Sequence, residues 1–410
     1  MRNGWTGGQY SLFRAFLGAW LLFRYGALLP HAGELFSNRG VLPDGAASPL
    51  LSLFPNLFAL ADSPAVVCAL VSLAAGASVF FAIGKFDRTA AVLLWYAGAC
   101  LQGRNPLAFD RGASFVGWIL LAHALLPPAP FGSQARRGRA DPGMDWRFPP
   151  TLLAAAWVVL AATHAFAGIA ELRSPSWTDG TVLERLLGGP LARPGVVREA
   201  LLDLPRPLLR GASLACLAVD LAFAPLACFR KARPWIWAAG LVKEILLGIC
   251  GTEDLSFRIS HLFFFDPGWI RAKAAVAPDR VFFDGSCGLC HRFVRFALAE
   301  DARGERFRFS PLESEAFRAA VPPERRPGLP DSLVLLAADG TLLTKSRAVL
   351  HLASRLGGVW RILAGAARLA PAPLSDLAYD GVARVRRRLF RTPEQSCPIV
   401  PPKLRDRFDL

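Results

Sequence analysis

Long apolar runs separated by short polar connectors occupy the first two thirds of this chain. A helix needs about 20 mostly apolar residues to cross the hydrocarbon core of a bilayer. Eight segments approach that requirement: Leu12–Leu29, Pro64–Ile83, Thr89–Leu107, Ala113–Leu126, Pro150–Ala170, Ala212–Phe229, Pro234–Cys250 and Leu255–Ile270. The second, fifth, sixth and seventh are the strongest candidates, whereas the third, fourth and eighth have short apolar cores or internal charge. A 410-residue chain with 53% hydrophobic and 19% charged residues is also too apolar for an ordinary soluble protein. The pattern predicts an all-α polytopic membrane helical bundle.

The net charge of +15 follows the same plan, because basic residues gather between the apolar runs. Examples are the clusters at residues 136–139 and 230–233. Such clusters orient membrane helices, and they argue against nucleic acid as a partner. If the amino terminus is cytoplasmic, these connectors lie on the cytoplasmic side of a cell membrane that the chain crosses several times. With eight crossings the region after them is cytoplasmic, which we favour, and with seven it is external.

The pattern changes after Ala274, where long apolar runs vanish. The change divides the chain into a membrane domain at residues 8–272 and a second domain at residues 278–410. Short segments of alternating type in the second domain predict a small α/β fold. The expected strands are 281–283, 307–310, 332–337 and 341–344, and the expected helices are 289–298, 313–319 and 346–356.

A closely spaced cysteine pair opens the first of these helices. The segment Val281–His291 reads as a short apolar strand, a turn at Asp284 and Gly285, and then Cys287-Gly-Leu-Cys290. Unpaired backbone amides at a helix start stabilise the thiolate of Cys287, so this residue is the expected nucleophile. Cys290 lies one turn further on and is the expected resolving thiol. Asp284 is a candidate proton acceptor, and a turn or cap residue is the alternative.

Three other interpretations of the cysteine pair stay open. A zinc half-site needs a second Cys/His pair with ligand spacing, which this domain lacks, so we expect no metal. Cys-x-x-Cys-His is also the pattern for covalent haem c attachment. The third alternative is a purely structural pair. Cys397 is a candidate third thiol, or an idle buried cysteine.

The segment Asp284-Gly-Ser-Cys-Gly-Leu-Cys290 resembles the signature of the DCC family of thiol-disulfide oxidoreductases, also known as DUF393. The resemblance continues through Phe309–Leu312, Ser346, Leu356–Trp360 and Cys397, and it covers about 130 residues. It implies a thioredoxin-like fold and dithiol chemistry on a protein dithiol or disulfide partner. Thioredoxin folds usually place a cis-proline beside the cysteines, and Pro330 is the candidate here.

The membrane domain resembles the HTTM family, which is related to vitamin K-dependent gamma-glutamyl carboxylase. The resemblance rests on Ser174–Gly180, His261–Trp269 and Arg14. Ala170 and Glu171 stand where the carboxylase has its active lysines, which argues against carboxylase activity. Polar residues within the apolar segments are functional candidates by default. They are Arg14, Arg24, His123, His164, Asp220, Lys243, Glu244, Arg258 and His261. Candidate contacts for a quinone-like lipid in the bundle are His164, Glu171, Arg258 and His261, whereas Asp220 and Lys243 suit a structural ion pair.

These observations lead to three functional hypotheses. The first is a membrane-anchored thiol-disulfide oxidoreductase that requires no cofactor. The second is a transducer that passes electrons between a quinone-like lipid and the dithiol. The third is a membrane scaffold whose soluble domain binds partners without redox turnover. The basic stretch Arg384–Arg391 fits contact with anionic lipid headgroups, with a solvated helix face as the alternative.

Overall fold

The computed structural model describes residues 3–109, 112–139, 141–190, 192, 194–249, 255–274, 276–330, 333–389 and 402–409. The chain forms two compact units, each described here by itself. Unit 1 contains residues 13–126 and 149–265. Unit 2 contains residues 2–12, 127–148 and 266–410, so it is built from three separate stretches of chain.

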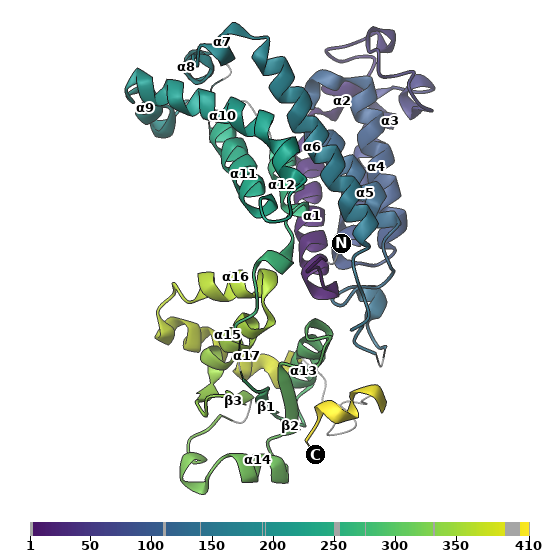
Figure 1. The fold of residues 1–410 in the computed structure, drawn as a ribbon. Helices are drawn as coiled ribbons and strands as arrows, with labels where there is room; N and C mark the ends of the chain where they lie inside the picture. Colours follow the sequence, from purple (N-terminus) through teal and green to yellow (C-terminus); the bar gives the residue numbers. More distant parts are fainter. Residues whose placement is uncertain are drawn as a thin grey trace. The chain divides into compact units, whose positions relative to one another are not determined.

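Unit 1 consists of helices and connecting loops in the part that the structure describes (Figure 1). The helices are α1 (Gly7–Leu28), whose residues 7–12 belong to unit 2, α2 (Ala32–Phe36), α3 (Pro64–Ile83), α4 (Asp87–Arg104), α5 (Gly112–Ala124), α6 (Pro150–Leu172), α7 (Pro175–Thr178), α8 (Val182–Gly188), α9 (Val196–Leu202), α10 (Arg206–Ala227), α11 (Arg233–Ile249) and α12 (Leu255–Phe263). Neighbouring pairs include α3 with α4, α4 with α5, α6 with α10, and α5 with α12.

Local sequence explains where these helices begin and end, as α3 illustrates. Pro64 occupies its first turn, where the missing amide proton is not needed. The helix ends at Gly84, which adopts φ +71° and donates its amide to the Phe80 carbonyl at 3.1 Å. Glycine suits this left-handed position because it has no Cβ.

Four stretches among the described residues are long and apolar enough to cross a membrane, judged by length and composition. They are residues Gly7–Phe36, Pro64–Ile83, Pro150–Leu172 and Arg206–Ala227. Helix α5 is apolar but has only 13 residues. These stretches indicate a membrane-associated helical part.

The eighth predicted segment is wrong as one continuous helix. Helix α12 has nine residues and ends at Phe263, so it is about 14 Å long against a hydrocarbon core of about 30 Å. Asp266 then caps a separate 3₁₀ turn, η6 (Pro267–Trp269), by accepting the Gly268 amide at 2.8 Å. Pro267 cannot continue an α-helix because it lacks the amide proton.

The centre of unit 2 is a mixed four-stranded sheet with strand order β2-β1-β3-β4. The strands are β1 (Asp279–Phe283), β2 (Phe307–Pro311), β3 (Leu333–Leu336) and β4 (Leu342–Thr344). Strands β1 and β2 are parallel, whereas β3 is antiparallel to both β1 and β4. The helices are α13 (Gly288–Glu300), α14 (Glu315–Ala320), α15 (Lys345–Leu356), α16 (Gly358–Ala367) and α17 (Ala372–Leu389), with the 3₁₀ helix η8 (Pro402–Arg407). This arrangement is consistent with a thioredoxin-like domain and confirms the α/β prediction.

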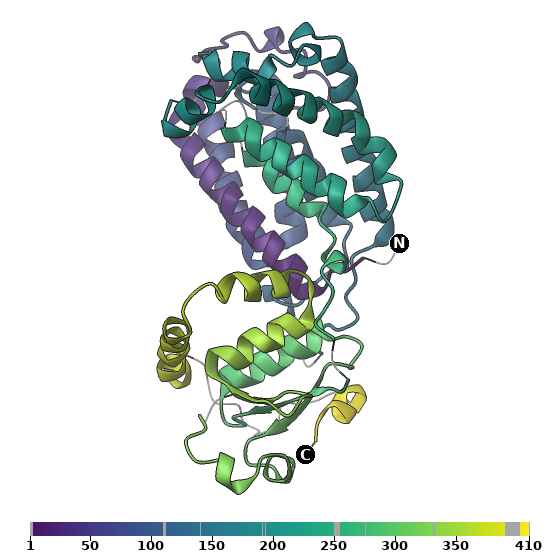
Figure 2. The same cartoon turned by 60° about the vertical axis from the view of Figure 1, so that its left-hand side comes forward.

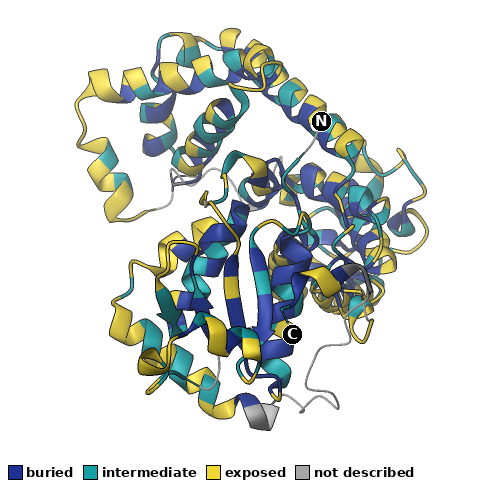
Figure 3. Cartoon of the chain, turned by 60° about the horizontal axis from the view of Figure 1, so that its bottom comes forward, coloured by how far each residue is buried: buried dark blue, intermediate teal, exposed yellow. Residues whose placement is uncertain are grey.

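Both faces of the sheet are covered, which explains why β1 is apolar along most of its length. On one face, Val281 and Phe283 pack with residues of α13 and α15. On the other face, Phe282 packs with Phe317 of α14 and with Val321. Figure 2 shows these layers, and in Figure 3 the central strands are mostly dark blue. The first face contains both cysteines, Cys287 and Cys290, in its core.

The two distant stretches of unit 2 attach to the sheet domain through specific contacts. The Gly4 amide donates to the Asp266 carboxylate at 2.7 Å, and the Val359 amide donates to the Gln9 side chain at 2.9 Å. A Cβ on Gly4 would lie 2.0 Å from the Gly268 nitrogen, so this close approach requires glycine. From residues 127–148, the Phe131 ring packs against a phenylalanine of α13, Phe296.

Candidate dithiol site

Cys287 is the N-cap residue of α13, as the sequence predicts. Its Sγ atom accepts a hydrogen bond from the Cys290 amide at 3.3 Å. Its backbone is extended, with φ −99° and ψ 113°, so the chain enters the helix directly from the turn after β1. A sulfur in this position faces the unpaired amides and the positive end of the helix dipole, which favour a negative charge on it.

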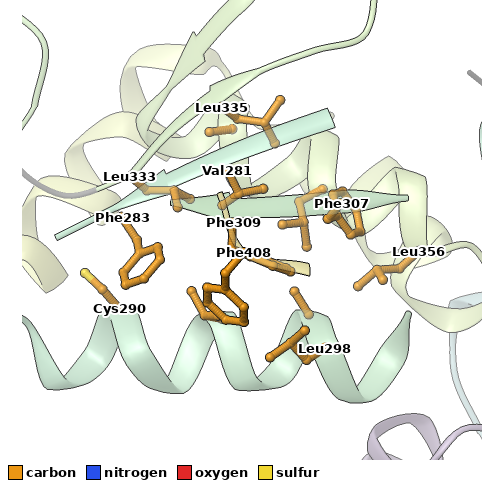
Figure 4. Packing of buried hydrophobic residues seen from close by; sticks show 14 of the residues in the cluster. Val281, Phe283, Cys290, Leu298, Phe307, Phe309, Leu333, Leu335, Leu356 and Phe408 are labelled. Carbon is orange, nitrogen blue, oxygen red and sulfur yellow. The ribbon is translucent and has the colours of Figure 1, made fainter. Parts of the chain in front are cut away.

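Cys290 lies on the buried side of the first helical turn. Figure 4 shows it at the start of α13, below the strands and close to Phe283. Burial raises the pKa of the Cys290 thiol, and the neighbouring Cys287 raises it further. The Cys290 sulfur therefore keeps its proton, whereas the Cys287 sulfur accepts a hydrogen bond from a backbone amide. This difference suits a nucleophile paired with a resolving thiol.

Asp284 organises the turn between β1 and α13. Its carboxylate accepts the amide of Ser286 at 2.8 Å and the hydroxyl of the same residue at 2.6 Å. Its carbonyl accepts the Cys287 amide at 3.2 Å. His291 closes the turn from the helix side, because its Nε2 atom lies 2.9 Å from the Gly285 carbonyl oxygen. These contacts give Asp284 the turn-forming role that was the alternative to proton transfer.

Arg386 of α17 is the site residue that sequence reasoning missed. Its guanidinium lies 3.4 Å from the Asp284 carboxylate, and both side chains are almost fully buried. The prediction of an exposed basic stretch at Arg384–Arg391 is wrong for Arg386, which is buried. The missed signal is the spacing of Ala378, Tyr379, Val382 and Arg386, which places all four on one face of α17.

The other predicted features of this domain have mixed outcomes. No cis peptide bond occurs among the described residues, so the bond before Pro330 is trans and that prediction is wrong. Cys397 and Arg391 lie outside the described residues. In the part of the chain that the structure describes, no group of three or more His, Cys, Asp or Glu side chains is arranged to hold a metal ion.

In unit 1, several predicted polar residues form a buried cluster. Asp220 lies 2.6 Å from His164 Nδ1 and 2.6 Å from Lys243 Nζ, which is the ion pair expected between α10 and α11. The rings of His164 and His261 are 6.3 Å apart, so two of the predicted lipid contacts are neighbours. Glu171 is also buried.

Other predicted charges of unit 1 are paired elsewhere. Arg14 lies 3.4 Å from the Asp87 carboxylate, and His123 lies 3.5 Å from the same group. These contacts join α1, α4 and α5. Arg24 donates to the Ser256 hydroxyl.

A cavity of about 290 Å³ in unit 1 lies apart from all four candidate lipid contacts. Its lining includes Trp20, Arg24, Tyr25, Trp95 and Phe109, and none of His164, Glu171, Arg258 or His261. The cavity is thus mainly aromatic and apolar, with Arg24 as a basic residue in its lining.

Comparison with known proteins supports the dithiol interpretation. A family model described as DCC1-like thiol-disulfide oxidoreductase matches residues 281–392. The uncharacterized protein YuxK of Bacillus subtilis (strain 168) is 32% identical to this chain over 136 residues, which cover 32% of this chain and 94% of YuxK. No solved structure shows a significant match.

Proposed function

Because residues 281–392 make this chain a member of the DCC1-like thiol-disulfide oxidoreductase family through its C-terminal domain, we propose that it is a membrane-anchored enzyme that exchanges disulfides through Cys287 and Cys290. The observation that carries the proposal is the hydrogen bond from the Cys290 amide to the Cys287 sulfur at the start of α13. The apolar helices of unit 1 support the anchoring.

The proposed exchange has two steps. The Cys287 thiolate attacks one sulfur of a partner disulfide, which breaks that bond and releases one partner thiol after it takes a proton. Cys290 then loses its proton and attacks the Cys287 sulfur, which forms the Cys287–Cys290 disulfide and releases the second partner thiol. Two electrons pass to the partner, and the reverse sequence oxidises a partner dithiol. Asp284, whose carboxylate organises the turn before Cys287 and pairs with Arg386, is also the proposed proton acceptor for the second step.

The test replaces each cysteine separately in the purified full chain. In Cys287→Ser we expect disulfide exchange with glutathione disulfide to fall to the uncatalysed rate, because the attacking sulfur is gone. In Cys290→Ser the first step survives, so a mixed disulfide at Cys287 accumulates and is detected by mass spectrometry. Cys228→Ser removes an exposed cysteine of unit 1 and is the matched control. Undiminished exchange in Cys287→Ser contradicts the proposal.

A scaffold without redox turnover is the second candidate, and the burial of both cysteines favours it. Cys287 is 3% exposed and Cys290 is 8% exposed. Alkylation of the reduced protein with iodoacetamide separates the two functions. A redox enzyme has one thiol that reacts faster than ordinary cysteine, whereas a scaffold has two thiols that react only after unfolding.

We place the soluble domain on the cytoplasmic side. The three chain stretches that form unit 2 support this assignment. Residues 2–12, 127–148 and 266–410 belong to one compact unit. Segments that pack together lie on the same side of a membrane, and residues 127–148 carry the basic cluster at 136–139. A reducing compartment suits a reductase role.

The HTTM resemblance and a quinone-like ligand stay proposals for unit 1. The aromatic cavity beside Trp20 and Tyr25 supports an apolar ring ligand better than the ion-paired cluster around Asp220 does. The measurement is extraction of lipids from the purified protein, followed by a change in the redox state of the dithiol on addition of a short-chain quinone. Absence of both effects contradicts a quinone-linked function.

A further inference from the structure

A second feature of unit 2 bears on which partners reach the dithiol. Helix α17 stands beside α13 and α15, and the space between them is a cavity of about 480 Å³, which we call the α17 groove. Its walls include Leu289, Cys290 and Phe293 of α13, Val349 of α15, and Val382 of α17. Val382 is 52% exposed, so the groove is open to solvent along α17.

The α17 groove is almost entirely apolar, although it leads to a reactive pair. Two polar residues of its lining make other contacts: Ser346 donates to Asp376 at 2.5 Å, and Arg386 pairs with Asp284. A cavity of this size and apolar character is typical of a binding site. The groove therefore suits apolar side chains that lie next to a reacting sulfur.

A basic hollow adjoins this groove. It has a volume of about 320 Å³, shares Ser346 and Leu350 with the α17 groove, and is lined by Arg347 and Arg368. Both arginines are exposed. An occupant of both spaces therefore carries apolar groups and, next to them, an anionic group.

We propose that the α17 groove and the basic hollow together bind a cysteine-bearing polypeptide segment with apolar residues beside the cysteine and an acidic residue further along. The inference rests on the proposed dithiol exchange, for which it supplies the substrate class. The apolar residues lie between α17 and α13, which brings the partner disulfide to the start of α13, where Cys287 stands three positions before the groove residue Cys290. The acidic residue faces Arg347 and Arg368. The exchange itself has the two steps and the electron balance given above.

The test compares two short peptides, each with one cysteine held as a mixed disulfide with thiopyridine, whose release is followed by absorbance. One peptide has leucine and phenylalanine around the cysteine, followed by two glutamates, and the other has serine and glutamine throughout. With the reduced full chain in detergent, we expect the first peptide to react at least about tenfold faster, because one buried apolar side chain already gives a factor of that order.

Matched variants test which part of the surface determines the preference for the first peptide. Val382→Asp places a charge in the groove, and Val385→Asp places one on an exposed valine of the same helix outside it. Arg347→Glu reverses a charge of the basic hollow, and Arg325→Glu reverses an exposed charge elsewhere. We expect the ratio of the two rates to fall toward one in Val382→Asp and Arg347→Glu, and to persist in both controls. Val382→Leu changes the same position but keeps the groove apolar. If the groove determines the preference for the first peptide, this variant retains that preference.

The outcomes separate this inference from the proposed function. No reaction of either peptide, or equal reaction in Cys287→Ser, rejects the dithiol chemistry itself. Equal rates for both peptides in the wild type reject only the groove. A preference for the first peptide that persists in Val382→Asp also rejects the groove as the binding site. A preference that appears only when anionic lipid vesicles are added rejects it too, because the apolar surface then binds the membrane.

Discussion

At the scale of single residues, two buried carboxyl groups of unit 2 have pKa values shifted in opposite directions. Asp279 accepts hydrogen bonds from the Arg355 guanidinium at 2.9 Å and the Ala338 amide at 2.9 Å. Burial by itself would raise the pKa of Asp279, but its hydrogen bonds and the nearby arginine lower it overall. Glu300 has no arginine partner within hydrogen-bond distance among the described residues, and burial raises its pKa.

Glu300 links the amino-terminal stretch to α13 and α16. Its carboxylate accepts the Gly8 amide at 2.9 Å, and it also accepts the Thr6 hydroxyl and the Trp360 indole. The carboxyl group of Glu300 thus joins the amino-terminal stretch to Trp360 of α16. Its ionisation state bears directly on how firmly those residues are held.

Glu300→Gln tests this linkage through the pH dependence of stability. A raised pKa in the folded state means that the stabilising contribution is present below the usual pKa of 4.5 and is lost as pH rises through the raised value. We therefore expect the stability of unit 2, followed by tryptophan fluorescence, to fall less between pH 4.5 and neutrality in Glu300→Gln than in the wild type. Glu324→Gln changes an exposed carboxylate and is the control. An equal pH dependence in wild type and Glu300→Gln contradicts the prediction.

At the scale of elements, the first strand and the helices beside it form the part of the molecule that positions the dithiol. Strand β1 ends at Phe283, and the turn at Asp284 passes directly into α13. Any change that shifts β1 relative to α15 also moves the turn. The contact between Asp279 and Arg355 joins these two elements at the opposite end of β1 from the cysteines.

Asp279→Asn measures the strength of that contact. The substitution leaves the buried Arg355 charge without its carboxylate, so we expect the free energy of unfolding of unit 2 to fall by about 3 kcal/mol. Asp339→Asn, which changes an exposed turn residue nearby, is the matched control, measured by the same denaturant titration. Equal stability in the two variants contradicts the prediction.

The local pattern of the sequence predicted the elements around the dithiol closely. It failed for contacts between residues that are far apart in the sequence. The apolar run Val281–Phe283 and the Cys-x-x-Cys spacing predicted β1 and the start of α13 because both depend on adjacent residues. The role of Arg386 depends on a partner 102 positions away. The charge count suggested a surface helix, whereas the structure buries this one arginine against Asp284. The predicted contacts His164 and His261 do lie together, but neither lines the aromatic cavity beside Trp20.

At the scale of the whole molecule, the three stretches that form unit 2 link the number of membrane crossings to the side of the membrane on which each stretch lies. Its three stretches come from the start of the chain, from the connector after α5, and from the region after α12. If unit 1 spans the bilayer, the chain returns to the same side each time it contributes to unit 2.

A topology experiment checks this coupling. Reporter domains fused before residue 3, inserted at residue 138 and fused after residue 409 are expected to report the same side of the membrane, because all three positions belong to unit 2. The basic connectors predict that this side is the cytoplasm. A carboxyl-terminal reporter on the opposite side from the amino-terminal one contradicts both the sidedness and the even number of crossings.

Unit 2 also sets an order of events during synthesis. The Asp409 amide donates to the Phe309 carbonyl at 3.0 Å, and the Phe408 ring packs against the Phe309 ring. Asn3 meets its partner Phe148 145 positions later, whereas Gly8 meets Glu300 292 positions later and Gln9 meets Val359 350 positions later. The contacts of residues 2–12 therefore form in stages during translation, and the edge of β2 stays uncovered until Phe408 has been added.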